Sequence, residues 1–114
     1  MAEIQIFGTN KCSETRKAMR FFQERRVKFH FRDLSEKGIS KGELDSIKSR
    51  INLEELIDRE GKRFREKQLQ FKLFDVETEL LADGLLFKTP IVRYGKLVTL
   101  GGENSTWAEW IKQR

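Results

Sequence analysis

A strand–helix–strand pattern in the first 33 residues constrains the fold more than any other feature of this sequence. The run Ile4–Phe7 is β-branched and aromatic, is too short for a helix, and is closed by Gly8. A helical spacing of apolar residues follows from Ser13, and residues 27–33 then alternate apolar and polar side chains with the period of a half-buried strand. The two strands of such a βαβ unit run parallel. We therefore expect an α/β fold.

Four helices are expected in the middle of the chain. Two of them begin at capping-box patterns, Ser40–Glu43 and Asn52–Glu55. The third helix should carry three residues on one face: Phe64, Gln68 and Phe71. The fourth should be capped by Asp75 and should turn four apolar side chains inward: Val76, Leu80, Leu81 and Leu85.

The last part of the chain returns to strand chemistry. Residues 90–100 hold two β-rich runs separated by Gly95-Lys96, a pair suited to a type II′ hairpin turn with glycine first. A final helix is expected over residues 103–114, with Ser105 and Thr106 as caps and with Trp107 and Trp110 as core anchors.

The net charge of +5 suggests a nucleic-acid partner until its distribution is considered. The excess lies in residues 11–33, which hold eight Lys or Arg and three Asp or Glu, around the chain's only cysteine. A thiol site therefore explains the charge, and a nucleic-acid partner is the less favoured interpretation. No segment approaches the roughly 20 apolar residues of a membrane span, and the first ten residues lack a signal-peptide pattern. We expect a cytoplasmic protein with no membrane partner.

Cys12 lies at or just before the N-terminus of the first predicted helix. One cysteine excludes an internal disulfide, and no second thiol stands at a metal-binding spacing, so no metal site is expected. The free amides of a helix N-terminus, Arg16 one turn on and the cationic segment should lower the pKa of the thiol. The same geometry suits an anion. A lone cysteine is also commonly a small buried hydrophobe, and spacing alone leaves both interpretations open.

The order of these elements resembles a thioredoxin-like fold. The stretches "CSETRKA", "REGKRFREKQL" and "KTPIVRYGKLVTLG" resemble the ArsC/Spx/YffB family of arsenate reductase-like proteins. Cys12, Arg16 and Lys17 match the family's C-x-x-[CST]-R-K stretch, and Pro90 matches its proline, which is cis in thioredoxin-like folds. The resemblance implies a single ArsC-like domain over residues 1–114. Its thioredoxin-like core, βαβ plus ββα on a mixed sheet, would comprise residues 1–35 and 88–114, with a helical insertion at 36–87.

The resemblance implies thiol redox chemistry in a bacterial protein. Cys12 would be the nucleophile, acting with glutathione, glutaredoxin or thioredoxin on a small oxyanion or a glutathione-linked substrate. Glutathione would be a co-substrate, and no cofactor would be bound. The residues expected to stabilise the thiolate or an anion are Arg16, Lys11, Ser13 and Glu14. Those expected to line the substrate groove are Thr89, Pro90, Arg59 and Arg93.

The chain departs from its relatives at two positions. Thr15 stands where Spx carries a second cysteine, so the intramolecular disulfide switch is absent. Thr89 stands where arsenate reductases place an arginine before the proline, which argues against arsenate as the substrate. The alternative function is a Spx-like regulatory binding module that contacts the α C-terminal domain of RNA polymerase without catalysis.

Overall fold

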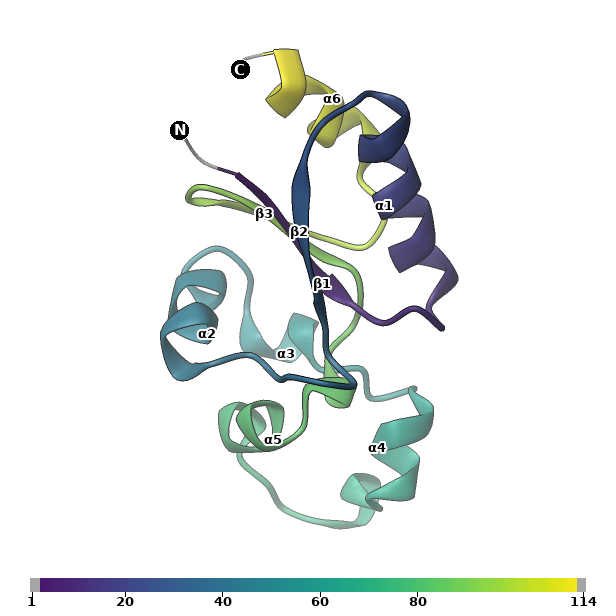
Figure 1. Cartoon of the computed structure of the whole chain (residues 1–114). Coiled ribbons are helices and arrows are strands. Elements are labelled where there is room, and N and C mark those ends of the chain that lie inside the picture. Colours follow the sequence, from purple (N-terminus) through teal and green to yellow (C-terminus); the bar gives the residue numbers. More distant parts are fainter. Residues whose placement is uncertain (1–2, 113–114) are drawn as a thin grey trace. The chain divides into compact units, whose positions relative to one another are not determined.

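The computed structural model describes residues 3–112, in two compact units: residues 3–33 with 89–112, and residues 34–88. The first unit contains β1 (Ile4–Gly8), α1 (Ser13–Glu24), β2 (Phe29–Asp33), β3 (Ile91–Tyr94), β4 (Leu97–Leu100) and α6 (Asn104–Lys112). Its four strands form one sheet in the order β2-β1-β3-β4 (Figure 1). The pair β1–β2 is parallel, and the pairs β1–β3 and β3–β4 are antiparallel. The mixed sheet and the predicted βαβ plus ββα order are confirmed.

The core of the first unit lies between the sheet and the two helices α1 and α6, which share one face of the sheet (Figure 1). Ile6 pairs with Val92 across β1 and β3, and both side chains are fully buried there. The indole ring of Trp107 lies 5.4 Å from the rings of Phe21 and Phe22. Trp107 and Trp110 are both buried, so their predicted role as core anchors is confirmed.

Some element ends in this unit differ from the prediction. The second strand begins at Phe29, two residues later than expected. The expected caps Ser105 and Thr106 lie within the first turn of α6 and do not precede the helix. Residues 113–114, the predicted end of that helix, lie outside the described residues.

The predicted hairpin turn is present. Of its two central residues, only Gly95 has a positive φ, 60°, as a type II′ turn requires. The Thr89–Pro90 peptide bond is cis.

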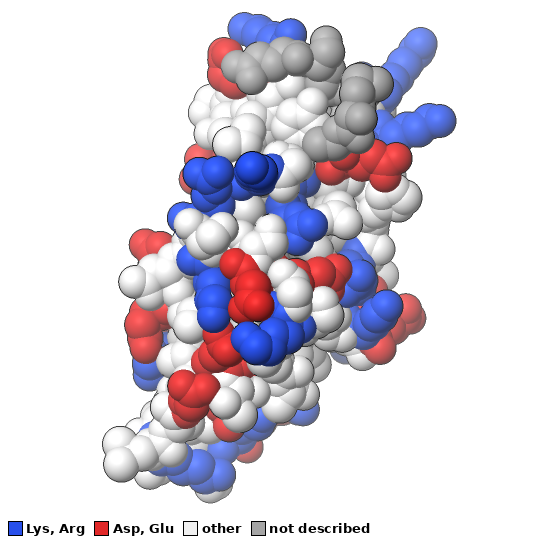
Figure 2. Space-filling view, turned by 90° about the vertical axis from the view of Figure 1, so that its left-hand side faces the viewer, with Lys and Arg blue, Asp and Glu red and all other residues white. Residues whose placement is uncertain are grey.

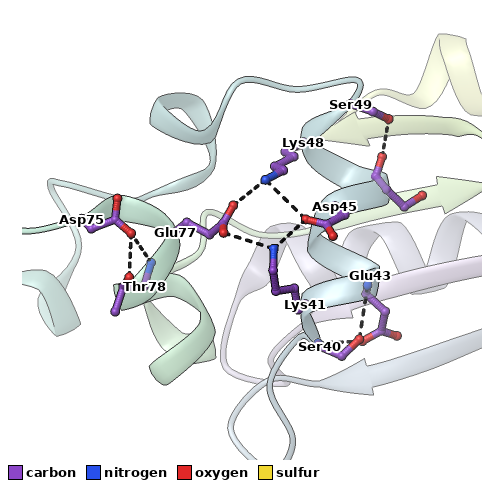
Figure 3. Close-up of polar contacts among 10 residues, drawn as sticks. Ser40, Lys41, Glu43, Asp45, Lys48, Ser49, Asp75, Glu77 and Thr78 are labelled. Carbon is purple, nitrogen blue, oxygen red and sulfur yellow. Dashed lines mark hydrogen bonds and ion pairs between the residues drawn. The ribbon is translucent and has the colours of Figure 1, made fainter.

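The second unit, residues 34–88, is the helical insertion. It contains α2 (Lys41–Lys48), α3 (Leu53–Leu56), α4 (Lys62–Glu66) and α5 (Val76–Ala82), with short 3₁₀ helices at Leu69–Phe71 and Gly84–Leu86. The expected capping box at Ser40 and Glu43 is present. Lys41 and Lys48 of α2 bridge Asp45 to Glu77 of α5 at distances of 2.6 to 3.4 Å (Figure 3).

Two expectations for the part of the insertion before α5 are wrong. Asn52 does not form a capping box, because its side chain accepts from the backbone N–H of Glu54 and the helix ends after four residues. Phe64 and Phe71 do not share a helix face, because α4 ends at Glu66 and Gln68 adopts a left-handed conformation with φ = 57°. Phe71 is consequently 80% exposed.

The expected inward face of α5 is only partly formed. Asp75 caps the helix as predicted, and Leu80 is fully buried. Leu85 lies beyond the end of α5 in the following 3₁₀ helix and is 39% exposed, so its predicted inward position is wrong. Within residues 3–112, no helix has the length and apolar character needed to cross a bilayer.

Candidate active site

A short turn after β1 places Cys12 at the start of α1. The backbone N–H of Cys12 donates to the carbonyl of Thr9 at 3.1 Å, and its own carbonyl accepts from the N–H of Arg16 at 3.1 Å. Cys12 is therefore the N-cap residue of α1, with an extended backbone and a partly exposed side chain. As the sequence predicts, the thiol lies beside the free amides of the first helical turn.

Thr15 and Gly8 pack against each other below this turn. Thr15 is fully buried although it is polar, and its side chain is so close to Gly8 that a Cβ there would lie 2.3 Å from Oγ1. The glycine at the end of β1 is thus needed for close approach of the helix. It fixes the first turn of α1, and with it Cys12, against the sheet.

The sulfur of Cys12 faces Thr89, which is 77 positions away in the sequence. Thr89 Oγ1 donates to Sγ at 3.1 Å, and the Thr89 carbonyl oxygen lies 3.9 Å from Sγ. Burial raises the pKa of the Cys12 thiol. The side-chain hydroxyls of Thr15 and Thr89 and the backbone N–H groups of Thr15 and Glu14 stabilise the thiolate. Their effect outweighs burial and holds the pKa of Cys12 below its ordinary value.

The two threonine hydroxyls do not act equally. Among residues 3–112, Thr15 Oγ1 has no hydrogen-bond partner within ordinary limits of distance and angle, so it acts on the sulfur as a nearby dipole. Thr89 makes a formed hydrogen bond. We assign the larger role to Thr89 on this geometry.

The four predicted stabilising residues are placed differently from one another. Glu14 acts through its backbone N–H, while its carboxylate pairs with Lys17 at 3.3 Å. Arg16 directs its guanidinium to the carbonyl of Asn10, with Nη1 at 2.7 Å, so it binds the loop that precedes the thiol. Ser13 is the first residue of α1, and both Ser13 and Lys11 are exposed. Binding of an anion by these side chains stays a prediction.

Of the predicted groove residues, Thr89 lies at the sulfur and Pro90, which follows it, is buried. Arg93 follows Val92 on β3, so its side chain leaves the sheet on the face opposite to α1 and α6. Arg59 belongs to the insertion, where its guanidinium pairs with Glu54 at 2.8 Å and lies 5.2 Å from the ring of Phe74. The predicted roles of Arg59 and Arg93 in a substrate groove stay predictions.

Sequence reasoning missed the hydroxyl groups of Thr15 and Thr89 as partners of the sulfur. For Thr15 a signal existed, because residues three apart on a helix are neighbours and Cys12 precedes it by three. For Thr89 the signal came only from the family resemblance, which placed it beside Pro90 in the substrate groove, because Thr89 is 77 positions from Cys12 in the sequence.

Comparison with known proteins identifies the relatives of this chain. No protein-family model matches it. The uncharacterised protein YusI of Bacillus subtilis is 33% identical over 113 residues, which cover 93% of this chain and 96% of YusI. The chain belongs to the family of YusI.

Solved structures connect this YusI family member with the arsenate reductase-like fold. A YFFB protein superposes with a TM-score of 0.78 at 22% identity, covering 93% of this chain and 96% of that one. An arsenate reductase from Vibrio cholerae superposes with a TM-score of 0.76 at 16% identity, covering 95% and 97%. The expected resemblance to the fold of YffB and arsenate reductase-like proteins, which is thioredoxin-like, is confirmed.

Proposed function

We propose that the chain is a thiol-dependent oxidoreductase in which Cys12 is the nucleophile and the second thiol comes from another molecule. The observation that carries the proposal is the hydrogen-bonded sulfur at the N-terminus of α1, whose pKa is lowered in spite of burial. The thiolate is the reactive form of cysteine, and a lowered pKa increases its share at neutral pH. The arsenate reductase-like fold supports this class of reaction.

The reaction needs two exchanges because the chain has one cysteine. In the first, the Cys12 thiolate attacks the glutathione sulfur of a glutathione-linked disulfide, a new S–S bond forms, and the other sulfur leaves as a thiolate. In the second, a glutathione, glutaredoxin or thioredoxin thiolate attacks the adduct, takes the glutathione sulfur and releases Cys12 as a thiolate. Each exchange conserves the number of disulfides, so no bound redox cofactor is needed.

Arsenate is the less favoured substrate. A tetrahedral oxyanion is bound best by bidentate guanidinium groups, and the position before Pro90 holds a threonine whose hydroxyl is engaged with the sulfur. Glutathione-linked disulfides require no such contact at the sulfur. We therefore propose a disulfide of this kind, and a cytoplasmic site of action where glutathione is abundant.

The test is mass spectrometry of the intact protein after exposure to oxidised glutathione, with an arsenate reduction assay in parallel. We expect one glutathione adduct on wild-type protein and none on Cys12→Ser. Reduced glutathione or glutaredoxin should then release the adduct, and arsenate turnover should be absent. An unmodified wild-type protein, or an adduct that no added thiol removes, would contradict the proposal.

The alternative is a regulatory binding module that contacts the α C-terminal domain of RNA polymerase. One observation favours a binding surface: the outward side of α1 exposes Glu14, Arg16, Lys17 and Arg20. If Cys12→Ser leaves binding to that domain unchanged and the adduct test fails, this function would be favoured.

Direct nucleic-acid binding is less favoured. On the face shown in Figure 2, basic and acidic side chains are interspersed and do not form the continuous basic surface typical of nucleic-acid binding.

A further inference from the structure

Thr89 presents two different groups to the sulfur of Cys12. Its hydroxyl Oγ1 lies 3.1 Å from Sγ and its backbone carbonyl oxygen lies 3.9 Å away. A hydroxyl can donate its proton to a thiolate, whereas a carbonyl can only accept the weak bond of a protonated thiol. The closer of the two groups is the donor. The geometry at Thr89 therefore favours the ionised form of the cysteine.

The groups that stabilise a thiolate at this position are neutral. Thr89 and the backbone amides of Glu14 and Thr15 donate to the sulfur, and the hydroxyl of Thr15 acts as a nearby dipole. Of the two nearby cations, Arg16 donates to the carbonyl of Asn10, and the adjacent Lys11 is exposed to solvent. Hydrogen bonds from neutral groups at contact distance are screened little by dissolved salt, whereas attraction between separated charges is screened strongly.

We infer that Thr89 is the positioning residue of the thiol: its hydroxyl holds Sγ in place and stabilises the negative charge that Cys12 carries before attack and after release. The role of Thr89 in the reaction rests on the proposed function. Its effect on the ionisation of Cys12 does not, and it can be tested without substrate. Thr89 thus does at this sulfur, through a neutral donor, what the sequence led us to expect of Arg16.

Loss of this hydroxyl should affect reactivity in opposite directions at low and high pH. A hydrogen bond to an ionised group changes its ionisation equilibrium by about tenfold or more. A thiolate that is tenfold more basic is also about threefold more nucleophilic. Below the thiol pKa, Thr89→Val should therefore react about threefold more slowly, because thiolate is scarcer. Above it, the variant should react about threefold faster, because each thiolate is more nucleophilic.

The experiment measures the rate of Cys12 alkylation by iodoacetamide from about pH 5 to about pH 10. Thr89→Val keeps the β-branched shape and removes the hydroxyl, and Thr89→Ser keeps the hydroxyl. Thr99→Val is the matched control, because Thr99 accepts from Trp107 Nε1 at 2.8 Å in the same unit and is not a donor to the sulfur. We expect the rate curves of wild type and Thr89→Val to cross, and those of Thr89→Ser and Thr99→Val to follow wild type.

Uniform slowing of Thr89→Val at every pH would indicate mere distortion of the site and would overturn the inference, as would an unchanged curve. A Thr89→Ser curve that follows Thr89→Val would overturn it too. Repeating the wild-type titration in high salt gives a further check, since neutral donors predict little change in its midpoint. These outcomes are separate from the glutathione test: crossing curves without an adduct would leave the inference standing and the proposed function refuted.

Discussion

Gly8→Ala tests the packing that positions the candidate active site. The added methyl would lie 2.3 Å from Thr15 Oγ1 and 2.7 Å from its Cγ2, where atoms in contact normally lie about 3.5 Å apart or more. Gly8 has no left-handed backbone angle, so the cost is steric alone. Thr15 is fully buried and cannot turn out to solvent.

The magnitude follows from two opposing effects. Overpacking of this kind costs about 1–3 kcal/mol, and the reduced freedom of the unfolded chain returns about 0.4–1 kcal/mol. The net loss of unfolding free energy should be about 1–2 kcal/mol, or a fall in Tm of roughly 5–10 °C. Urea denaturation followed by circular dichroism measures it. Gly42→Ala is the matched control, because nothing lies within 4 Å of a Cβ at this helical position; it should gain about 0.5–1 kcal/mol.

A double-mutant cycle identifies Thr15 as the cause. Thr15→Ala removes Oγ1 and Cγ2 and leaves only its Cβ, at 3.0 Å from the added methyl. In that background Gly8→Ala should cost at least about 0.5 kcal/mol less than in wild type, the coupling expected of residues in contact. The reasoning would be refuted by a Gly8→Ala protein as stable as wild type, or by an equal cost in both backgrounds.

Two further predictions concern the insertion. Ser40→Ala removes the cap of α2 and should lower the unfolding free energy by about 1 kcal/mol in urea denaturation. Ser40→Thr should retain most of the wild-type stability. Equal stability of all three proteins would contradict a stabilising role of the Ser40 cap. The second concerns pH. Hydrogen bonds to Lys48 and Lys41 lower the pKa of Glu77, and hydrogen bonds to the same lysines lower the pKa of Asp45 (Figure 3). A carboxyl group whose pKa is lower in the folded chain than in the unfolded chain contributes to stability. That contribution is complete above the pKa of the unfolded chain, about pH 4, and is lost as the pH falls through the pKa of the folded chain. Glu77→Gln should therefore unfold more easily at neutral pH and lose less stability on acidification; a decline as steep as that of wild type would refute the role of Glu77.

The sheet and its helices could be predicted because their patterns are local and mutually consistent. The apolar run before Gly8 and the alternation at residues 27–33 each predict a strand, and the helix between them favours their parallel pairing. The insertion was harder, because its helices are short. The third helix, α4, is followed by a left-handed conformation at Gln68, and glutamine is not a residue type that predicts such a conformation. Short helices depend on tertiary packing more than on intrinsic propensity.

The position of Cys12 and the role of the helix N-terminal amides could be predicted, but the hydrogen bond from Thr89 could not. Placement at a helix N-terminus follows from residues next to one another in sequence. The approach of Thr89 depends on the path of the whole unit, and only the folded chain brings the two residues within 3.1 Å. The sequence also suggested a cation as stabiliser, since Arg16 stands one turn from the cysteine; in the structure the guanidinium binds the Asn10 carbonyl.

Because neutral groups stabilise the thiolate, the positive charge of residues 11–33 is not required for ionisation of Cys12 and can serve another role. Exposed cations such as Lys11 and Arg20 act on molecules in solution, and a field of this kind raises the encounter rate of anionic partners. Glutathione is an anion at neutral pH. The encounter with glutathione and the ionisation of Cys12 would then depend on different groups. High salt should slow formation of the glutathione adduct, because it screens the cations, and should leave the pH midpoint of Cys12 alkylation unchanged. If both change together, the cations act on the sulfur itself, and the separation of the two roles is wrong.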